Sequence, residues 1–401
     1  DLELVEFLKL RLGYGIIGNE SIGPYSSQAL LVPTDVVFND VLTIGFEPFI
    51  FPNSDLRWES TEQFNFGLDF STAGGRIQVT TDYYIKNTFD LLLSTDVPFY
   101  SGFTSVFSNV GDLKNSGFEF SVSSHNLTGA FTWNTDFNIA WNQNTITNLA
   151  GRDNIPNSAS LFGVESWALL TEGEPVGRFY GLITDGIVQI GENTEAVANF
   201  AAAPPLEPGD RKFVDRNNDG VINGDDRTFI GSAQPDFSFG INNSLSYKGF
   251  DLNFFLQGVS GNQIVNFNKF LVEQQNGTSN ITLEYFANRW TPQNPSNRYP
   301  KVNADPGLAR RFISDAEVED GSYLRLKNVT LGYSLPANIL NKYKIANCKI
   351  YLTAKNLYTL TNYSGFDPEV SHFGQSATNM GADLGGYPTT KSYILGINLG
   401  F

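Results

Sequence analysis

The sequence predicts an all-β fold, a transmembrane antiparallel β-barrel whose strands are joined by long extracellular loops at one rim. Three observations indicate this fold: the composition, a set of long alternating segments, and the unequal lengths of the connections between them. Aromatic residues make up 14% of the 401 residues, with 33 Phe and 38 Gly, and a chain rich in aromatic residues favours strands over helices. No stretch offers the roughly 18 uncharged apolar residues that a membrane-spanning helix needs. A barrel strand alternates instead, so a mean hydropathy of -0.19 is compatible with a membrane location.

The clearest alternating segment covers residues 131–142. Its odd-numbered positions are aromatic or aliphatic except Thr135, whereas its even-numbered positions are mostly Thr, Asn and Asp. Because successive side chains of a strand point to opposite faces, one face suits hydrocarbon and the other suits water. Trp133 and Trp141 lie on the apolar face about 26 Å apart, which matches the two aromatic girdles of a membrane barrel.

Two pairs of alternating segments predict hairpins. Residues 63–70 and 77–83 flank the turn 71–75, and residues 237–247 and 250–257 flank the dipeptide Lys248-Gly249. We expect further strands at about 6–16, 115–125, 322–335, 347–358 and 390–401, which gives on the order of ten spanning strands. The intervals 144–175, 190–234, 258–320 and 359–389 are long and polar. This asymmetry predicts short periplasmic turns at one rim and long loops at the other, where ligands and partners would bind.

A soluble β-sandwich also alternates, and two features favour the barrel over it. The segments run to about 10–14 residues, beyond the roughly 5–6 that are usual for a globular sheet. Their apolar faces are rich in Phe, Trp and Tyr, while the opposite faces carry Asn, Gln, Ser, Thr and Gly, as expected beside an aqueous lumen. The chain also ends on an alternating strand whose last residue is Phe401.

Charge and cysteine content narrow the class of protein further. The 26 basic and 42 acidic residues give a net charge of -16, which argues against nucleic acid as a partner because its phosphates require a basic surface. The single Cys348 lies in an alternating segment and is interpreted as a small hydrophobic residue. Asp1 opens the chain without the features of a signal peptide, so we expect the chain to be part of a longer protein.

The sharpest local motif is the segment 215–226, which predicts a structural calcium site on a loop. Oxygen ligands stand at positions 1, 3, 5, 7, 9 and 12 of an EF-hand or dockerin-type loop, with Gly220 at the position of the sharp turn. The expected ligands are Asp215, Asn217, Asp219, the carbonyl of Val221, Asn223 (directly or through water) and Asp226. The alternative is a turn cluster of Asn, Asp and Gly without metal, and an Asp at the twelfth position weakens bidentate binding.

Little in the sequence supports catalysis. His125 and His372 are the only histidines, and no zinc-protease, nucleophile-elbow or cysteine-zinc pattern is present. Asp367 and Glu369 resemble the carboxylate pair of a glycosidase, but a loop position without further signals favours an ordinary structural role. Trp167 and Trp290 lie in predicted loops, where packing is expected rather than stacking on a sugar.

Several motifs resemble the SusC/RagA family of TonB-linked outer-membrane proteins. The segment LRWESTEQFNFGLD at 56–69 is followed in the family's order by DYYIKNTFDLL at 82–92, GFTSVFSNVG at 102–111 and NSGFE at 115–119. Residues 172–187, VEDGSYLRLKNVTLGY at 318–333 and Lys355-Asn356-Leu357 also fit. The resemblance extends over nearly the whole chain.

The resemblance implies that residues 1–401 form the C-terminal half of a roughly 22-stranded barrel in the outer membrane of a bacterium of the Bacteroidota, without the plug and N-terminal domains. It implies a TonB-dependent importer of oligosaccharides or peptides, which is in contact with outer-membrane lipid. Its partners would be a SusD-like surface lipoprotein and, through the N-terminal part, TonB. A second hypothesis is a barrel of this family that serves as a structural scaffold in an assembly or secretion complex. A soluble calcium-binding adhesin is a third.

Overall fold

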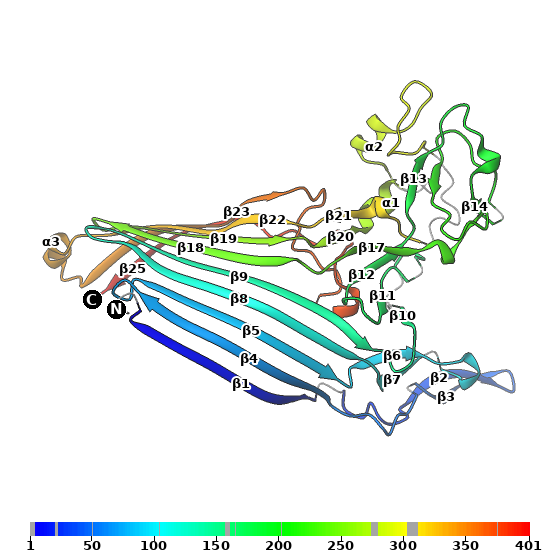
Figure 1. Cartoon of the computed structure of the whole chain (residues 1–401), viewed down its shortest axis with the longest axis horizontal. Helices are drawn as coiled ribbons and strands as arrows, with labels where there is room; N and C mark the ends of the chain where they lie inside the picture. Colours follow the sequence, from blue (N-terminus) through cyan, green and yellow to red (C-terminus); the bar gives the residue numbers. More distant parts are fainter. Residues whose placement is uncertain are drawn as a thin grey trace.

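A computed structural model describes residues 5–20, 23–49, 51–103, 105–156, 161–164, 166–201, 203–273, 280–302, 312–374 and 376–401. Its main feature is a curved ten-stranded sheet in the order β1-β4-β5-β8-β9-β18-β19-β22-β23-β25 (Figure 1). The strands are β1 (Phe7–Asn19), β4 (Glu59–Thr72), β5 (Ile77–Phe89), β8 (Asp112–Thr128), β9 (Phe131–Asn148), β18 (Phe237–Tyr247), β19 (Phe250–Ser260), β22 (Tyr323–Ser334), β23 (Asn347–Thr361) and β25 (Ser392–Gly400). All neighbours are antiparallel, and the edge strands β1 and β25 each pair on one side only among the described residues.

The strand predictions are confirmed. Each predicted segment forms one strand of the sheet, and β4–β5 and β18–β19 are the two predicted hairpins. The boundaries differ at the ends, because β9 continues to Asn148 and β23 to Thr361, so the loops predicted to begin at 144 and 359 begin later. Parts of the predicted loops 144–175, 190–234 and 258–320 lie outside the described residues.

The connections are long at one end of the sheet and short at the other, as the sequence predicts. The strands join at one end through the turns 73–76, 129–130 and 248–249 and through the segment 335–346, which holds the short helices α3 (Ala337–Leu340) and η6 (Asn341–Tyr343). Both chain termini lie at this end (Figure 1). All longer connections extend from the opposite end, which we call the loop end.

The long connections contain the remaining elements. Residues 20–58 and 90–111 hold β2 (Leu31–Phe38), β3 (Val41–Pro48), β6 (Leu92–Asp96), η1 (Phe99–Ser101) and β7 (Ser105–Asn109). Residues 149–236 hold β10 (Asn154–Pro156), β11 (Leu169–Thr171), β12 (Arg178–Gly181), β13 (Thr184–Ile187), η2 (Thr194–Ala196), β14 (Asn199–Phe200), β15 (Arg211–Phe213), β16 (Val221–Ile222), η3 (Gly224–Asp226) and β17 (Thr228–Ser232). Residues 261–322 hold β20 (Gln263–Asn266), α1 (Phe267–Glu273), α2 (Leu283–Asn288), η5 (Asp315–Glu317) and β21 (Val318–Asp320), and residues 362–391 hold η7 (Ala377–Asn379) and β24 (Ala382–Asp383).

One face of the sheet is apolar and uncovered. Leu12, Phe66, Tyr83, Phe118 and Trp141 form a transverse row across five neighbouring strands, and all five side chains are exposed. A monomeric soluble protein rarely exposes so continuous an apolar surface, whereas the outer face of a membrane barrel meets lipid. We therefore call this face the outer face and the opposite one the inner face.

The buried core lies in the connections at the loop end. Trp167, Phe179, Val265, Phe267 and Ile313 are fully buried in one cluster, and they come from two connections that are distant in the sequence. Ala382 of a third connection completes it. We call this packed unit the loop body. No helix among the described residues is long and apolar enough to cross a membrane.

Candidate functional site

The inner face of the sheet carries polar side chains whose charges are paired across strands. Arg11 on β1 donates to Asp69 on β4 at 3.0 Å and to Asp82 on β5 at 2.9 Å. Its guanidinium passes over Gly67, where an added Cβ would lie 2.6 Å from the guanidinium carbon. A glycine at this position lets one cation reach both carboxylates.

The same arrangement returns further along the sheet. Lys349 donates to Asp251 at 2.8 Å and passes over Gly332, where a Cβ would lie 2.5 Å from the lysine chain. Between these pairs the inner face presents amides and hydroxyls, and Asn253, for example, donates to Asn242 and Ser244. The inner face is thus strongly polar, and the charges of Arg11 and Lys349 are paired with carboxylates on it.

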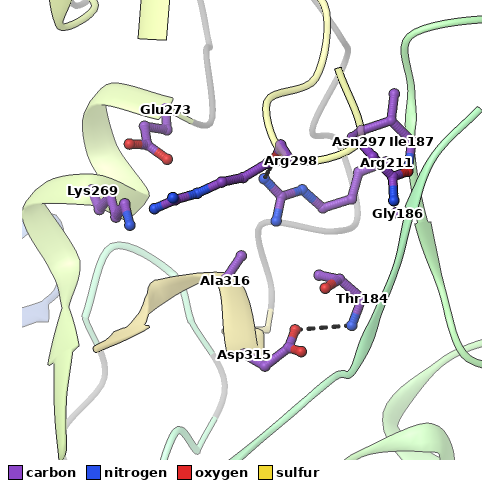
Figure 2. A pocket seen from close by; sticks show the side chains of 10 residues that line it. All are labelled: Thr184, Gly186, Ile187, Arg211, Lys269, Glu273, Asn297, Arg298, Asp315 and Ala316. Carbon is purple, nitrogen blue, oxygen red and sulfur yellow. Dashed lines mark hydrogen bonds between the residues drawn. The ribbon is translucent and has the colours of Figure 1, made fainter. Parts of the chain in front are cut away.

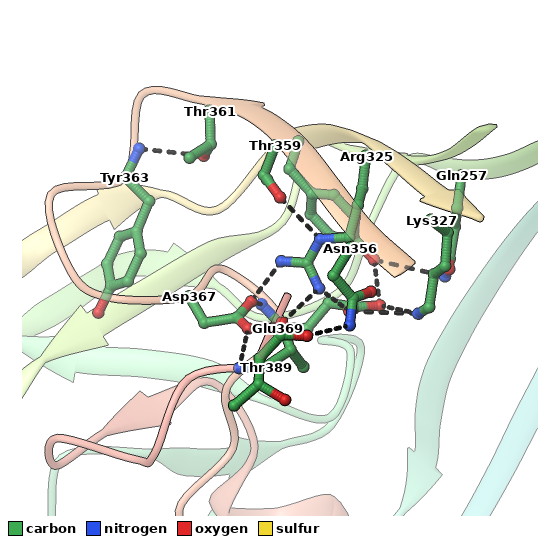
Figure 3. A network of polar contacts seen from close by, with 12 residues as sticks. Gln257, Arg325, Lys327, Asn356, Thr359, Thr361, Tyr363, Asp367, Glu369 and Thr389 are labelled. Carbon is green, nitrogen blue, oxygen red and sulfur yellow. Dashed lines mark hydrogen bonds and ion pairs between the residues drawn. The ribbon is translucent and has the colours of Figure 1, made fainter. Parts of the chain in front are cut away.

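The connection 362–391 is fastened to the inner face by Arg325 (Figure 3). Arg325 is 2% exposed, and it donates to Thr359 at 2.8 Å, to Asp367 at 2.6 Å and to Glu369. Asp367 in turn accepts hydrogen bonds from the backbone N–H groups of Glu369 and Thr389, each at 2.9 Å. Two carboxylates and one guanidinium therefore hold this connection against β22 and β23.

This network decides the role of the two carboxylates that resemble a glycosidase pair. Burial alone would raise the pKa of Asp367, but hydrogen bonds from Thr389 and Arg325 outweigh burial and lower the pKa to about 2. A general acid needs a raised pKa. Asp367 and Glu369 thus act as anchors of the connection.

The segment 215–226 closes on itself through its own side chains. Asp215 accepts N–H bonds from Asn218 at 2.7 Å and from Gly220 at 2.8 Å, and Asp219 accepts the N–H of Val221 at 2.8 Å. These bonds bring the predicted ligands into one loop. They are Asp215, Asn217, Asp219, Val221, Asn223 and Asp226.

Asp226 at the twelfth position is fully buried. Its carboxylate accepts the N–H groups of Arg216 at 2.9 Å and of Asn223 at 2.8 Å. A carboxylate has about four lone-pair sites, so these two bonds leave acceptor capacity for a cation. In the part of the chain that the structure describes, no group of three or more His, Cys, Asp or Glu side chains is already arranged around a metal position.

A pocket of about 360 Å³ lies in the loop body between β13, β15, α1 and η5 (Figure 2). Three basic side chains line it, Arg211 from β15, Lys269 from α1 and Arg298 from the connection after α2. Glu273, from the last turn of α1, also lines the pocket. Its burial raises the pKa of its carboxyl to about 7, more than the nearby cations lower it.

The remaining residues singled out by the sequence lie apart from these sites. His125 is exposed near the short-turn end of β8 and contacts Asn134 at 2.7 Å, and His372 is exposed in the connection 362–391. Trp167 and Trp290 are 0% and 7% exposed, which confirms the prediction that they pack in loops. Cys348 pairs with Leu399 at the short-turn end of β23.

Comparison with known proteins decides the family. The family model described as TonB dependent receptor-like, beta-barrel, matches residues 4–357. The chain belongs to this family. The ten-stranded sheet, which we call the wall, is therefore part of a barrel of the bacterial outer membrane.

Two curated relatives and one solved structure illustrate how much of a whole receptor of this family the chain covers. TonB-dependent receptor P3 of Formosa agariphila is 36% identical over 100% of this chain and 40% of its own length. TonB-dependent receptor SusC of Bacteroides thetaiotaomicron is 31% identical over 100% of this chain and 38% of its own length. The structure of the RagAB peptide transporter aligns with a TM-score of 0.81 and 26% identity, over 99% of this chain and 41% of that one. The chain thus spans about two fifths of the length of the curated relatives that it matches.

The sequence did not reveal the cationic pocket or the Arg325 anchor of the receptor barrel. Arg211, Lys269 and Arg298 stand in polar stretches with no shared motif, so nothing local marks them as neighbours. The position of Arg325 in the sequence could have indicated an anchor. Arg325 stands between Leu324 and Leu326 in a strand, and a basic residue that is buried there requires a carboxylate partner.

Proposed function

We propose that this chain forms the C-terminal part of the barrel of an outer-membrane TonB-dependent importer. The observation that carries the proposal is the wall itself, with an exposed apolar row on its outer face and paired polar groups on its inner face. Such a wall separates lipid from an aqueous lumen. Membership of the receptor family and the likeness to the RagAB peptide transporter support import as its purpose.

The cargo is proposed to be an oligosaccharide or a peptide too large for porins. The inner face offers amide and hydroxyl groups, and its charges at Arg11 and Lys349 are already paired. Such a surface can exchange hydrogen bonds with a hydrated polar cargo without holding it tightly. We further propose that the chain moves its cargo chemically unchanged, because the two carboxylates closest to a catalytic pattern are held by Arg325.

The proposed partners are a SusD-like surface lipoprotein that closes the barrel from outside and TonB, which acts through the N-terminal part of the protein. The loop body supports the first of these, because it forms a packed platform at the loop end of the wall. The relatives named as TonB-dependent receptors support the second.

Native purification tests the proposal. The full protein, tagged at its chromosomal gene, would be extracted in mild detergent and its partners and its own peptides identified by mass spectrometry. A surface lipoprotein together with plug and TonB-box peptides of the same gene, and loss of uptake when tonB is deleted, would support import. Barrel-assembly or secretion components in place of that lipoprotein would refute import and favour the scaffold.

We also propose a structural calcium ion in the loop 215–226. The all-oxygen donor set and the side chains that already fold back onto the loop support it. Binding of ⁴⁵Ca²⁺ to the full protein is expected to be lost in Asp215→Asn. The variant Asp225→Asn is the control, because Asp225 is not one of the six expected ligands. Equal calcium binding by both variants and the wild type would contradict the proposal.

A further inference from the structure

The pocket between β15 and α1 concentrates positive charge on a strongly acidic chain. Three basic side chains line this pocket of about 360 Å³, although the chain as a whole has a net charge of -16. Figure 2 shows the guanidinium group of Arg211 in the middle of the lining and that of Arg298 beside Lys269 and Glu273. The three residues come from separate segments, so only the folded loop body brings them together.

Among the described residues, no carboxylate that lines the pocket forms an ion pair with these cations. Among the described residues Arg211 and Arg298 have no ion pair, and the contact between them is a hydrogen bond of 3.4 Å from Arg211 to the carbonyl of Arg298. Lys269 forms an ion pair of 3.3 Å with Glu319, which stands outside the pocket lining, so Arg211 and Arg298 are the unpaired cations of the pocket among the described residues. Two guanidinium groups with free donors in one pocket form a natural receptor for a planar oxyanion.

The acidic groups of the lining do not cancel this charge. Asp315 accepts the backbone N–H of Thr184 at 2.9 Å and is thereby turned toward the backbone. Glu273 has no hydrogen bond or ion pair to any described residue, and burial raises the pKa of its carboxyl to about 7. At and below neutral pH a large share of Glu273 is therefore uncharged, and the pocket keeps a surplus of cations.

We propose that this pocket binds a carboxylate or another oxyanion group of the imported cargo. The proposal rests on the import function proposed above and adds a substrate class to it, a polar oligomer that carries anionic groups. Arg211 and Arg298 supply the hydrogen-bond donors and the unpaired positive charge. Glu273 opposes the anion once it ionises, so binding weakens as the pH rises through about 7.

The groups that face Glu273 all belong to the pocket and its surroundings. They are Lys269 on its own helix, Arg211 on β15, Arg298 on the connection after α2, and Asp315 and Glu317 on η5. Glu317 is held by the N–H and the hydroxyl of Ser314, at 2.8 and 2.7 Å. Replacing Glu273 by Gln separates its own titration from the effects of these neighbours.

The test uses the full receptor with its native partner in detergent and [¹³C]acetate as the probe. Acetate is a single carboxylate and is ionised at both pH 6 and pH 8. Its dissociation constant would be measured from NMR line broadening at constant ionic strength. Arg211→Gln should weaken binding on the order of tenfold, since one close cation is lost. Arg152→Gln removes the same charge from an exposed position outside the pocket, and it should leave binding unchanged.

The pH series supplies a second readout. In the wild type, acetate should bind on the order of fivefold more weakly at pH 8 than at pH 6. In Glu273→Gln, this difference should disappear while binding at pH 6 is kept. Equal binding by Arg211→Gln and the wild type, or an unchanged pH effect in Glu273→Gln, would overturn the proposal.

A carboxylate of the partner could occupy the pocket in place of the cargo. Acetate binding that appears only after the partner is stripped away would show this and would overturn the cargo assignment. These measurements need no transport, so they can fail while TonB-dependent uptake succeeds, and the reverse. The two proposals are therefore tested separately.

Discussion

Replacing Arg325 by Met is expected to release the connection 362–391 from the barrel wall. The side chains of Arg325 and Asp367 are 3% and 4% exposed, so water cannot replace the guanidinium without a local rearrangement. Glu369 loses the guanidinium in the same step but keeps its bonds to Lys327 at 3.0 Å and to the hydroxyl of Tyr323 at 2.8 Å, so Asp367 is the carboxylate left without a cation. Met preserves much of the length and apolar volume of the side chain, so the change removes charge and hydrogen bonds more than packing.

The magnitude follows from Asp367, whose carboxylate stays buried without a cation. Removing one partner of a buried ion pair costs roughly 3–5 kcal/mol, because the other charge stays buried without compensation. The lower figure corresponds to roughly a hundredfold rise in the population of the open connection. The sheet keeps its ladder of backbone hydrogen bonds, so we expect local opening with an unchanged wall.

Hydrogen–deuterium exchange of the full receptor in detergent measures this opening. The reporting amides are those of Glu369 and Thr389, which are bonded to Asp367. The control is Lys301→Met, which lies outside this connection, breaks pairs with Glu207 and Asp210, and should cost at most about 1 kcal/mol for each pair. Exchange in peptides of 362–391 that stays within about threefold of wild type in Arg325→Met would refute the anchoring argument.

The same connection should respond to acid. The folded pKa of Asp367 is lowered to about 2, below its value of about 3.9 in an open chain. Its contribution to stability is therefore fully present above about pH 4 and is lost as the pH falls through about 2. After correction for intrinsic exchange, opening should rise roughly eightfold between pH 6 and pH 3. Asp367→Asn should abolish this dependence, and an equal acid response in the variant would show that other groups cause it.

Three further predictions concern the wall and the loop body. Phe66→Arg should lower the free energy of unfolding by roughly 2–4 kcal/mol because it places a charge against lipid. Asn65→Arg, on the inner face, should be tolerated. Urea unfolding in micelles compares the two variants. Gly67→Ala should cost about 1–3 kcal/mol in the same assay because its Cβ would press on the guanidinium above it. Gly15→Ala, with nothing within 4 Å, should be close to neutral. Trp167→Ala should destabilise the loop body by about 3–5 kcal/mol, seen as faster exchange around 161–182 with no change in the strands.

The strands of the wall could be predicted from the sequence because the alternation that identifies each strand lies within one short segment. A period of two assigns each side chain of a strand to a face without knowledge of its neighbours. The short turns after Thr72 and Tyr247 then fix two hairpins. The pairs that cross the strands could not be predicted in this way. Arg11 and Asp82 are 71 positions apart, and their meeting over Gly67 depends on the register of three strands.

The loop body and its sites escaped prediction for a related reason. Long polar connections predict loops, yet their few apolar residues pack into the most buried cluster of the chain. Trp167 and Phe267 are 5.6 Å apart by ring centroid, although no periodic pattern connects their segments. The proposed calcium loop 215–226 could be recognised in the sequence because its candidate ligands lie within twelve consecutive positions, whereas the pocket cations Arg211 and Lys269 belong to different connections.

The connection 362–391 joins the wall to the loop body at two places. Near its start, Asp367 is held to the wall by Arg325, and further on, β24 adds a parallel strand to β20 with Ala382 beside Val265. Helix α1 follows β20 without a break, and it carries Lys269 into the cationic pocket. Arg325 and the cationic pocket are therefore linked through the connection 362–391, β20 and α1. The anchor at Arg325 thus fixes the first part of a connection whose later part, β24, pairs with the strand that leads into the helix carrying Lys269.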